Sequence, residues 1–124
     1  MTFLIIDDAM VMRNIHKNVL REHGFADESF REAGDGETAL GIARAESIDL
    51  FLVDWNIPKL SGLEFIRKIR SMEKYAKTPV IMITSEAAKY NVLEAIEAGT
   101  TDYLVKPIKA ALLWEKLSRY VGSS

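Results

Sequence analysis

The chain has 124 residues, of which 48% are hydrophobic and 27% charged, with 18 acidic against 16 basic side chains. This is the length of a single domain that can bury its own core, and the charge balance provides no basic field for nucleic acid or an anionic membrane. Cysteine is absent, which excludes disulfides, thiolate metal sites and cysteine nucleophiles.

Short apolar runs alternate with helical patterns from the first residues onward. Phe3–Ile6 is too short and too rich in strand-forming residues for a helix, so it predicts a strand. Residues 10–23 carry apolar side chains at helical spacing and end at Gly24, which is typical of a helix C-terminus. A weak extended segment at 29–33 and a helix at 37–45 follow.

The same alternation continues through the second half of the chain. Strands are predicted at 50–53, 80–83 and 103–105, and helices at 62–70, 87–98 and 109–121. In the helix at 87–98 we expect Val92, Leu93 and Ile96 to face the core, and Gly99 to end the helix.

Five strand–helix units in succession indicate an α/β fold. Strands that are apolar on both faces belong in a parallel sheet covered by helices on both sides. Right-handed crossovers then favour a doubly wound, flavodoxin-like (βα)5 arrangement with strand order 2-1-3-4-5. We expect residues 1–124 to form one domain, with a ligand crevice at the carboxyl ends of the first and third strands.

Polar residues follow four of the predicted strands. Asp7 and Asp8 follow the first strand, Asp54 the third, Thr84 the fourth and Lys106 the fifth. The carboxyl ends of parallel strands share one edge, so these side chains should converge. Three carboxylates in one crevice require a compensating proton or cation, and a hard ion such as Mg²⁺ suits oxygen ligands.

Each of these residues also has a purely structural interpretation. Asp8 could cap the first helix, Asp54 could start a turn, Thr84 could be a structural hydroxyl and Lys106 a solvated surface lysine. The joint occurrence of suitable residue types at four separate strand ends favours a functional site.

The same segments resemble a known family, the receiver domain of two-component response regulators, and within it the stand-alone chemotaxis regulators. The resemblance covers essentially the whole chain. It is carried by Asp7-Asp8, residues 53–58 with Gly62-Leu63-Glu64, Thr84-Ser85-Glu86, and residues 103–107.

The resemblance implies a role for each residue of the site. Asp54 would accept a phosphoryl group from a histidine kinase. Asp8 and Asp54 would bind Mg²⁺ directly, Asp7 through water and Asn56 through its backbone carbonyl. Lys106 would neutralise the phosphoryl group in transfer, and the Lys106-Pro107 bond would be cis. The chain would thus catalyse its own phosphorylation and dephosphorylation without being a conventional enzyme.

The resemblance also implies a switch. The Thr84 hydroxyl would move toward the phosphoryl group and Tyr103 would fill the space it leaves. Taken without the resemblance, Tyr103 would be a half-buried strand aromatic. Asn56 and Glu86 would control how water reaches the acyl phosphate, and hence its lifetime.

The expected output is a partner-binding face, which in chemotaxis regulators contacts the flagellar motor switch protein. Its predicted residues are Lys89, Val92, Ile96, Tyr103, Val105, Trp114 and Lys116. The alternative output is a phosphorelay, in which the phosphoryl group passes to another histidine protein; it would use the same active-site residues.

Two positions depart from the family pattern. Trp114 lies beside the apolar stripe of the last helix, where relatives tend to be polar. It could anchor a partner or lie flat over a neighbouring side chain. Ala9 replaces the hydroxyl, acid or aromatic of many relatives, which puts a phosphatase partner in doubt.

Two other functional classes fit the sequence less well. A flavin carrier of this fold would need a phosphate cradle where Asp7-Asp8 would repel a phosphate. A hydrolase of this fold could use an aspartyl nucleophile at the end of the first strand. Here the expected nucleophile, Asp54, follows the third strand, which argues against that class. No segment resembles an export signal or a membrane helix, so we expect a cytoplasmic monomer that binds neither nucleic acid nor membrane.

Overall fold

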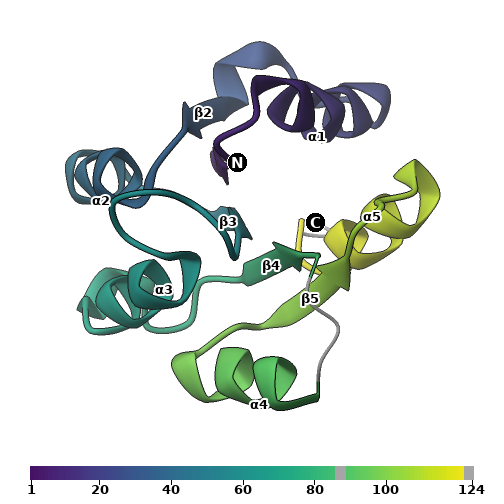
Figure 1. Ribbon diagram of the computed structural model, residues 1–124. Helices are drawn as coiled ribbons and strands as arrows, with labels where there is room; N and C mark the ends of the chain where they lie inside the picture. The colour runs from purple at the N-terminus through teal and green to yellow at the C-terminus, as the bar shows by residue number, and fades with distance from the viewer. Residues whose placement is uncertain (86–88, 122–124) are drawn as a thin grey trace.

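The structure is a computed structural model that describes residues 1–85 and 89–121. Its five strands form one parallel sheet in the predicted order β2-β1-β3-β4-β5 (Figure 1). The strands are β1 (Phe3–Ile6), β2 (Phe30–Ala33), β3 (Leu50–Asp54), β4 (Val80–Thr84) and β5 (Asp102–Val105). The helices are α1 (Met10–Glu22), α2 (Gly36–Ala45), α3 (Gly62–Arg70), α4 (Lys89–Ala98) and α5 (Ala110–Ser118), with 3-10 turns at Asp27–Ser29 and Glu73–Tyr75.

Helices cover both faces of the sheet, α1 and α5 on one face and α2, α3 and α4 on the other (Figure 1). Side chains alternate between the two resulting cores along each strand. On β3, Phe51 and Val53 pack under α2 and α3, whereas Leu50 and Leu52 pack under α1 and α5. Burial of alternate residues on opposite faces explains why the strands read as continuous apolar runs.

Local sequence determines several helix ends. Asp35 and Ser61 cap α2 and α3 by accepting hydrogen bonds from Thr38 N and Glu64 N. Gly99 follows α4 at a φ of +111°, a conformation that suits glycine, as predicted. At the start of α3, a Cβ on Gly62 would collide with the carbonyl oxygen of Asp54, so only glycine lets this helix begin against the end of β3.

The prediction for the buried side of α4 was wrong. Leu93 and Ile96 are 52% and 55% exposed, while Ala95 and Ala98 are buried. The small alanine side chains let the helix pack closely on its neighbours, so the larger apolar residues point outward. The last helix is also shorter than predicted, ending at Ser118, and the predicted start of α4 at Ala87 lies outside the described residues.

Within the part of the chain that the structure describes, no helix is both long enough and apolar enough to cross a membrane.

His16 is an unusual residue in the core beneath α1. It is 2% exposed, and neither ring nitrogen has a hydrogen-bond partner among the described residues. Burial lowers the pKa of His16 from 6.5 to about 4; the Asp7 carboxylate opposes this shift and the Lys106 ammonium adds to it. The imidazole is therefore neutral in the folded protein at pH 7.

We predict that His16 makes the protein less stable in mild acid. The folded pKa is below the unfolded one, so stability is fully present above pH 6.5 and is lost as the pH falls toward 4. Over this range His16 should remove about 3 kcal/mol from the free energy of unfolding. Urea unfolding of wild type and His16→Leu at several pH values measures this, because other titrating groups cancel in the difference. A pH-independent difference would contradict the prediction.

Candidate functional site

The carboxylates of Asp7, Asp8 and Asp54 meet at the carboxyl edge of the sheet. β1 and β3 are neighbours in the sheet, with Ile6 paired to Val53, so the residues that follow are brought together. One oxygen from each carboxylate lies within 4.8 Å of the others. Asp7 and Asp54 are buried and Asp8 is exposed, so the cluster opens to solvent on the side of Asp8.

Lys106 brings a positive charge to the same edge from the end of β5. Its Nζ donates to Asp54 Oδ2 at 3.0 Å and lies 3.5 Å from Asp7 Oδ2. Its backbone N–H donates to Thr84 O, and the predicted cis bond to Pro107 is present. The long side chain thus spans the width of β4 to reach β3 and β1.

The electrostatics of the cluster show a deficit of positive charge. Burial raises the pKa of Asp54, the charge of Asp7 adds to this, and the Lys106 ammonium and the Asn56 amide only partly oppose it. Burial acts to lower the pKa of Lys106, but its contacts with Asp54 and Asp7 outweigh burial and raise that pKa. Lys106 is therefore firmly cationic, and one lysine does not compensate three carboxylates.

The donor set fits a hard divalent ion. Three carboxylates with converging oxygens and an opening to solvent are ligands that Mg²⁺ accepts together with water. Asn56 lies two residues beyond Asp54, and its N–H donates to Asp54 Oδ1 at 3.2 Å. This bond curls the backbone after β3, so Asn56 stays next to the cluster.

The predicted switch residues lie on the neighbouring strands. Thr84 ends β4 and is buried, while Tyr103 on β5 is half-buried against the core under α2, α3 and α4. Thr84 pairs with Val105 and Met82 with Tyr103 in the register of the two strands. Glu86 lies outside the described residues.

Most of the predicted partner face gathers around β5. The strand runs between α4 and α5 (Figure 1), and Val92, Tyr103 and Val105 are half-buried there while Ile96 is exposed. Lys116 on α5 donates to Asp102 Oδ1 at 3.0 Å, which ties its ammonium to β5. The side chain of Lys89 lies outside the described residues.

Trp114 makes an intramolecular stack. Its indole lies 3.8 Å from the ring of His23 at the end of α1, with 11° between the ring planes. This contact supports packing over a neighbouring side chain; binding of a partner by Trp114 stays a prediction.

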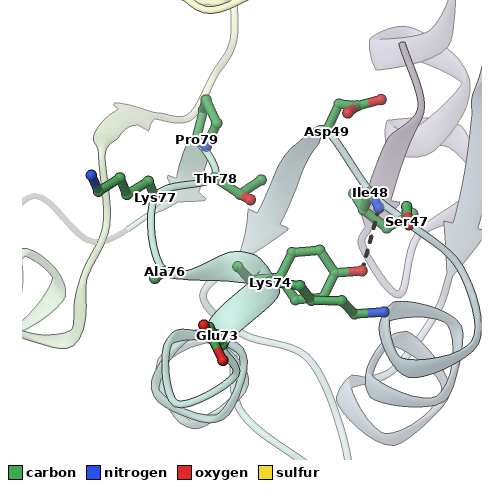
Figure 2. A pocket seen from close by; sticks show the side chains of 10 residues that line it. Ser47, Ile48, Asp49, Glu73, Lys74, Ala76, Lys77, Thr78 and Pro79 are labelled. Atoms are coloured by element: carbon green, nitrogen blue, oxygen red, sulfur yellow. Dashed lines mark hydrogen bonds between the residues drawn. The ribbon is translucent and has the colours of Figure 1, made fainter.

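A separate cavity lies at the opposite, amino edge of the sheet. The cavity has a volume of about 520 Å³. It is bounded by the segments 47–49 and 73–79, whose side chains are drawn in Figure 2. Its wall is held by Tyr75, whose hydroxyl accepts from Ile48 N and donates to Ala43 O or Glu46 O. It contains none of the predicted site residues, so its size alone does not make it the active site.

Two residues next to the site, Arg13 and His16, were not predicted from the sequence. Arg13 donates to the backbone carbonyl of Asp7 at 2.7 Å, and His16 is buried within the electrostatic field of Asp7 and Lys106. Both occupy ordinary helical positions, and their roles depend on where the helix packs, which residue spacing does not reveal.

Comparison with known proteins identifies the family. The sequence profile of the response regulator receiver domain matches residues 3–118. The chain belongs to the response regulator receiver family. Chemotaxis protein CheY-3 of Vibrio cholerae is 43% identical over 119 residues, covering 96% of this chain and 90% of that protein. Chemotaxis protein CheY of Pseudomonas aeruginosa is 40% identical, covering 96% of this chain and 94% of that protein.

Solved receiver structures agree with this assignment. The chemotaxis response regulator CheY4 of Vibrio cholerae superposes with a TM-score of 0.89 at 30% identity, over 97% of this chain and 98% of that one. The receiver domain of the sensor histidine kinase PA1611 from Pseudomonas aeruginosa gives 0.86 at 31% identity, over 98% of both chains. That structure carries a magnesium ion coordinated in its active-site cleft.

We predict that Lys106→Met destabilises the metal-free receiver in a pH-dependent way. Without the ammonium the pKa of Asp54 rises further, so the loss is largest at neutral pH and shrinks as the pH falls and Asp54 becomes protonated. We expect about 2–3 kcal/mol at pH 7, somewhat below the range for breaking a fully buried ion pair, because the Lys106 side chain is 24% exposed. Urea unfolding in EDTA measures this, with the exposed Lys77→Met as control. A loss that does not vary with pH would contradict the charge-compensation account.

Proposed function

We propose that this receiver accepts a phosphoryl group on Asp54 from a histidine kinase, with Mg²⁺ in the carboxylate cluster. The observation that carries the proposal is the contact of Asp54 with Lys106 beside two further carboxylates. An acceptor carboxylate, an adjacent cation and a metal-binding carboxylate pair are the groups that phosphoryl transfer to an aspartate needs.

The chemistry follows from the positions of these groups. An Asp54 carboxylate oxygen attacks the phosphorus of the donor phosphohistidine; a P–O bond forms, the P–N bond breaks, and the donor imidazole leaves. Lys106 Nζ holds Asp54 and neutralises charge on the phosphoryl oxygens. Asp7, Asp8, Asp54 and the carbonyl of Asn56 would hold Mg²⁺, which when bound supplies further charge neutralisation. Water then hydrolyses the acyl phosphate, at a rate that we attribute to access past Asn56 and Glu86.

An apolar surface next to the cluster suits the approach of the phosphodonor. Val11 on the first turns of α1 is 70% exposed, and Met10 and Ile15 are exposed beside it. A neighbouring groove of about 460 Å³ is lined by Met12, Ile15, Lys106, Pro107 and Ile108. The donor histidine must come within bonding distance of Asp54, so a kinase domain would cover this rim. Exposed apolar side chains grouped at an active site are typical of a protein interface.

A second apolar surface suits the output. Leu93 and Ile96 are exposed on α4, on the far side of β4 and β5 from α1. We propose that phosphorylation draws the Thr84 hydroxyl toward Asp54, that Tyr103 moves inward, and that the α4–β5–α5 face then binds its partner. Because two relatives are chemotaxis proteins by name, we propose the flagellar motor switch protein as that partner and the cytoplasm as the compartment.

A phosphorelay intermediate is the competing function. The likeness to a receiver from a sensor histidine kinase supports it, because that receiver shares fold and length with this chain. The two functions differ in whether the phosphoryl group moves on to a second histidine or the α4–β5–α5 face binds a partner.

Phosphotransfer with matched surface variants tests the proposal. A purified chemotaxis histidine kinase labelled from ATP should phosphorylate wild type but not Asp54→Asn. Val11→Glu should slow transfer about tenfold or more because a charge enters the donor interface, while phosphorylation by acetyl phosphate stays unchanged. Leu93→Glu, which also places a charge at an exposed apolar position, should accept phosphoryl normally and lose affinity for a motor switch peptide.

The contrary results are equally specific. Equal transfer rates for Val11→Glu and wild type would show that the phosphodonor does not bind at the apolar surface of α1. Unchanged peptide affinity in Leu93→Glu, with label passing to a histidine phosphotransfer domain, would favour the phosphorelay.

A further inference from the structure

The three-residue turn between β1 and α1 carries two of the cluster's carboxylates. Asp7 is buried, and its Oδ1 accepts a hydrogen bond from Ala9 N at 2.9 Å. Asp8 is exposed, and among the described residues none bonds to its carboxylate. Ala9 occupies the N-cap of α1 without a side chain that can cap the helix. The position of the Asp8 carboxylate therefore depends on the orientation of the backbone beneath it.

Arg13 holds that backbone. Its Nη1 donates to the carbonyl oxygen of Asp7 at 2.7 Å, and this carbonyl belongs to the peptide unit that joins Asp7 to Asp8. On the other side of Asp7, its N–H donates to Ala33 O at 3.1 Å. With both bonds present, the peptide before Asp8 has a fixed plane.

The guanidinium is itself fixed from the other side. Arg13 Nε donates to Glu32 Oε1 on β2 at 3.0 Å, and Lys17 Nζ contacts Glu32 Oε2 at 2.9 Å. The Arg13 and Lys17 side chains are only 17% and 14% exposed, whereas Glu32 between them is 34% exposed, so the two bonds lie at the surface over largely covered cationic side chains. A planar fork that binds a carbonyl and a carboxylate together cannot rotate without losing one of them.

We propose that Arg13 is a positioning residue of the metal site: bridging Glu32 and the Asp7 carbonyl, it orients the Asp7–Asp8 peptide and so places the Asp8 carboxylate for the divalent ion. The inference rests on the proposed Mg²⁺ site and adds a residue that touches neither the ion nor the phosphoryl group. The positive charge of Arg13 acts in the opposite direction, since it repels a cation. A substitution that keeps the positive charge but changes the hydrogen-bond geometry separates the orienting effect of Arg13 from its repulsion of the ion.

The test is a Mg²⁺ titration of Arg13→Lys. Lysine keeps the charge but has no fork to bridge Asp7 and Glu32, so the Kd for Mg²⁺ should rise about tenfold, as for other residues that orient metal ligands. Tryptophan emission reports binding, since Trp55 directly follows Asp54. Arg21→Lys is the matched control: Arg21 lies on the same helix and pairs with Asp27 away from the cluster, and its Kd should stay at the wild-type value.

A second variant keeps the test decisive if Arg13→Lys folds poorly. Glu32→Asp preserves every charge and shortens the anchor by one methylene, and it should raise the Kd about threefold. Unfolding by urea is measured beside each titration, because a merely structural role would lower stability and leave the Kd of the folded protein unchanged.

The outcomes distinguish this inference from the function on which it rests. Wild type that binds Mg²⁺, together with Arg13→Lys and Glu32→Asp that bind it equally well, would overturn the positioning role alone. A wild type whose emission and stability do not respond to Mg²⁺ would overturn the metal site and this inference together.

Discussion

The packing of like charges at one edge of the sheet is the constraint on which the rest of this structure depends. Asp7 and Asp54 are buried within reach of each other, and a single lysine spans from the end of β5 to contact both. Burial and mutual repulsion raise the pKa of Asp54 even with that lysine in place. A site with this residual negative charge favours whatever brings positive charge to it, which is why the proposed metal binding and the proposed phosphoryl transfer would belong together here.

The same lysine connects the cluster to the strand beside the proposed output surface. Its backbone N–H bonds to the carbonyl of Thr84, so the ends of β4 and β5 are joined directly beneath the crevice. α4 and α5 flank β5 (Figure 1), and α4 exposes Leu93 and Ile96. At the carboxyl end of α4, Arg70 of α3 donates twice to Gly99 O. The bond between the ends of β4 and β5 therefore lies between the cluster and the strand that α4 flanks.

Much of this arrangement could be predicted from the sequence, because it depends on patterns that act locally. Apolar runs of strand length predicted four of the strands, the second being a weaker extended segment, and right-handed crossovers favoured their order. The polar residues after those four runs indicated the cluster. Residue spacing could not predict which face of α4 is buried, because Leu93 and Ile96 have the spacing of a helical face whether that face is buried or exposed. Ala95 and Ala98 determine the close approach instead. Arg13 and His16 escaped notice because their partners are fixed by tertiary packing alone.

The central claim is that Asp54 is the residue that reacts, and that it does so only within its metal-loaded cluster. Intact mass after incubation with acetyl phosphate, followed by fragmentation of the adduct, tests this most directly. The account predicts one phosphoryl group per chain in Mg²⁺, located on Asp54, and none in EDTA. A phosphoryl group on another residue, or the same adduct formed at the same rate without metal, would contradict it.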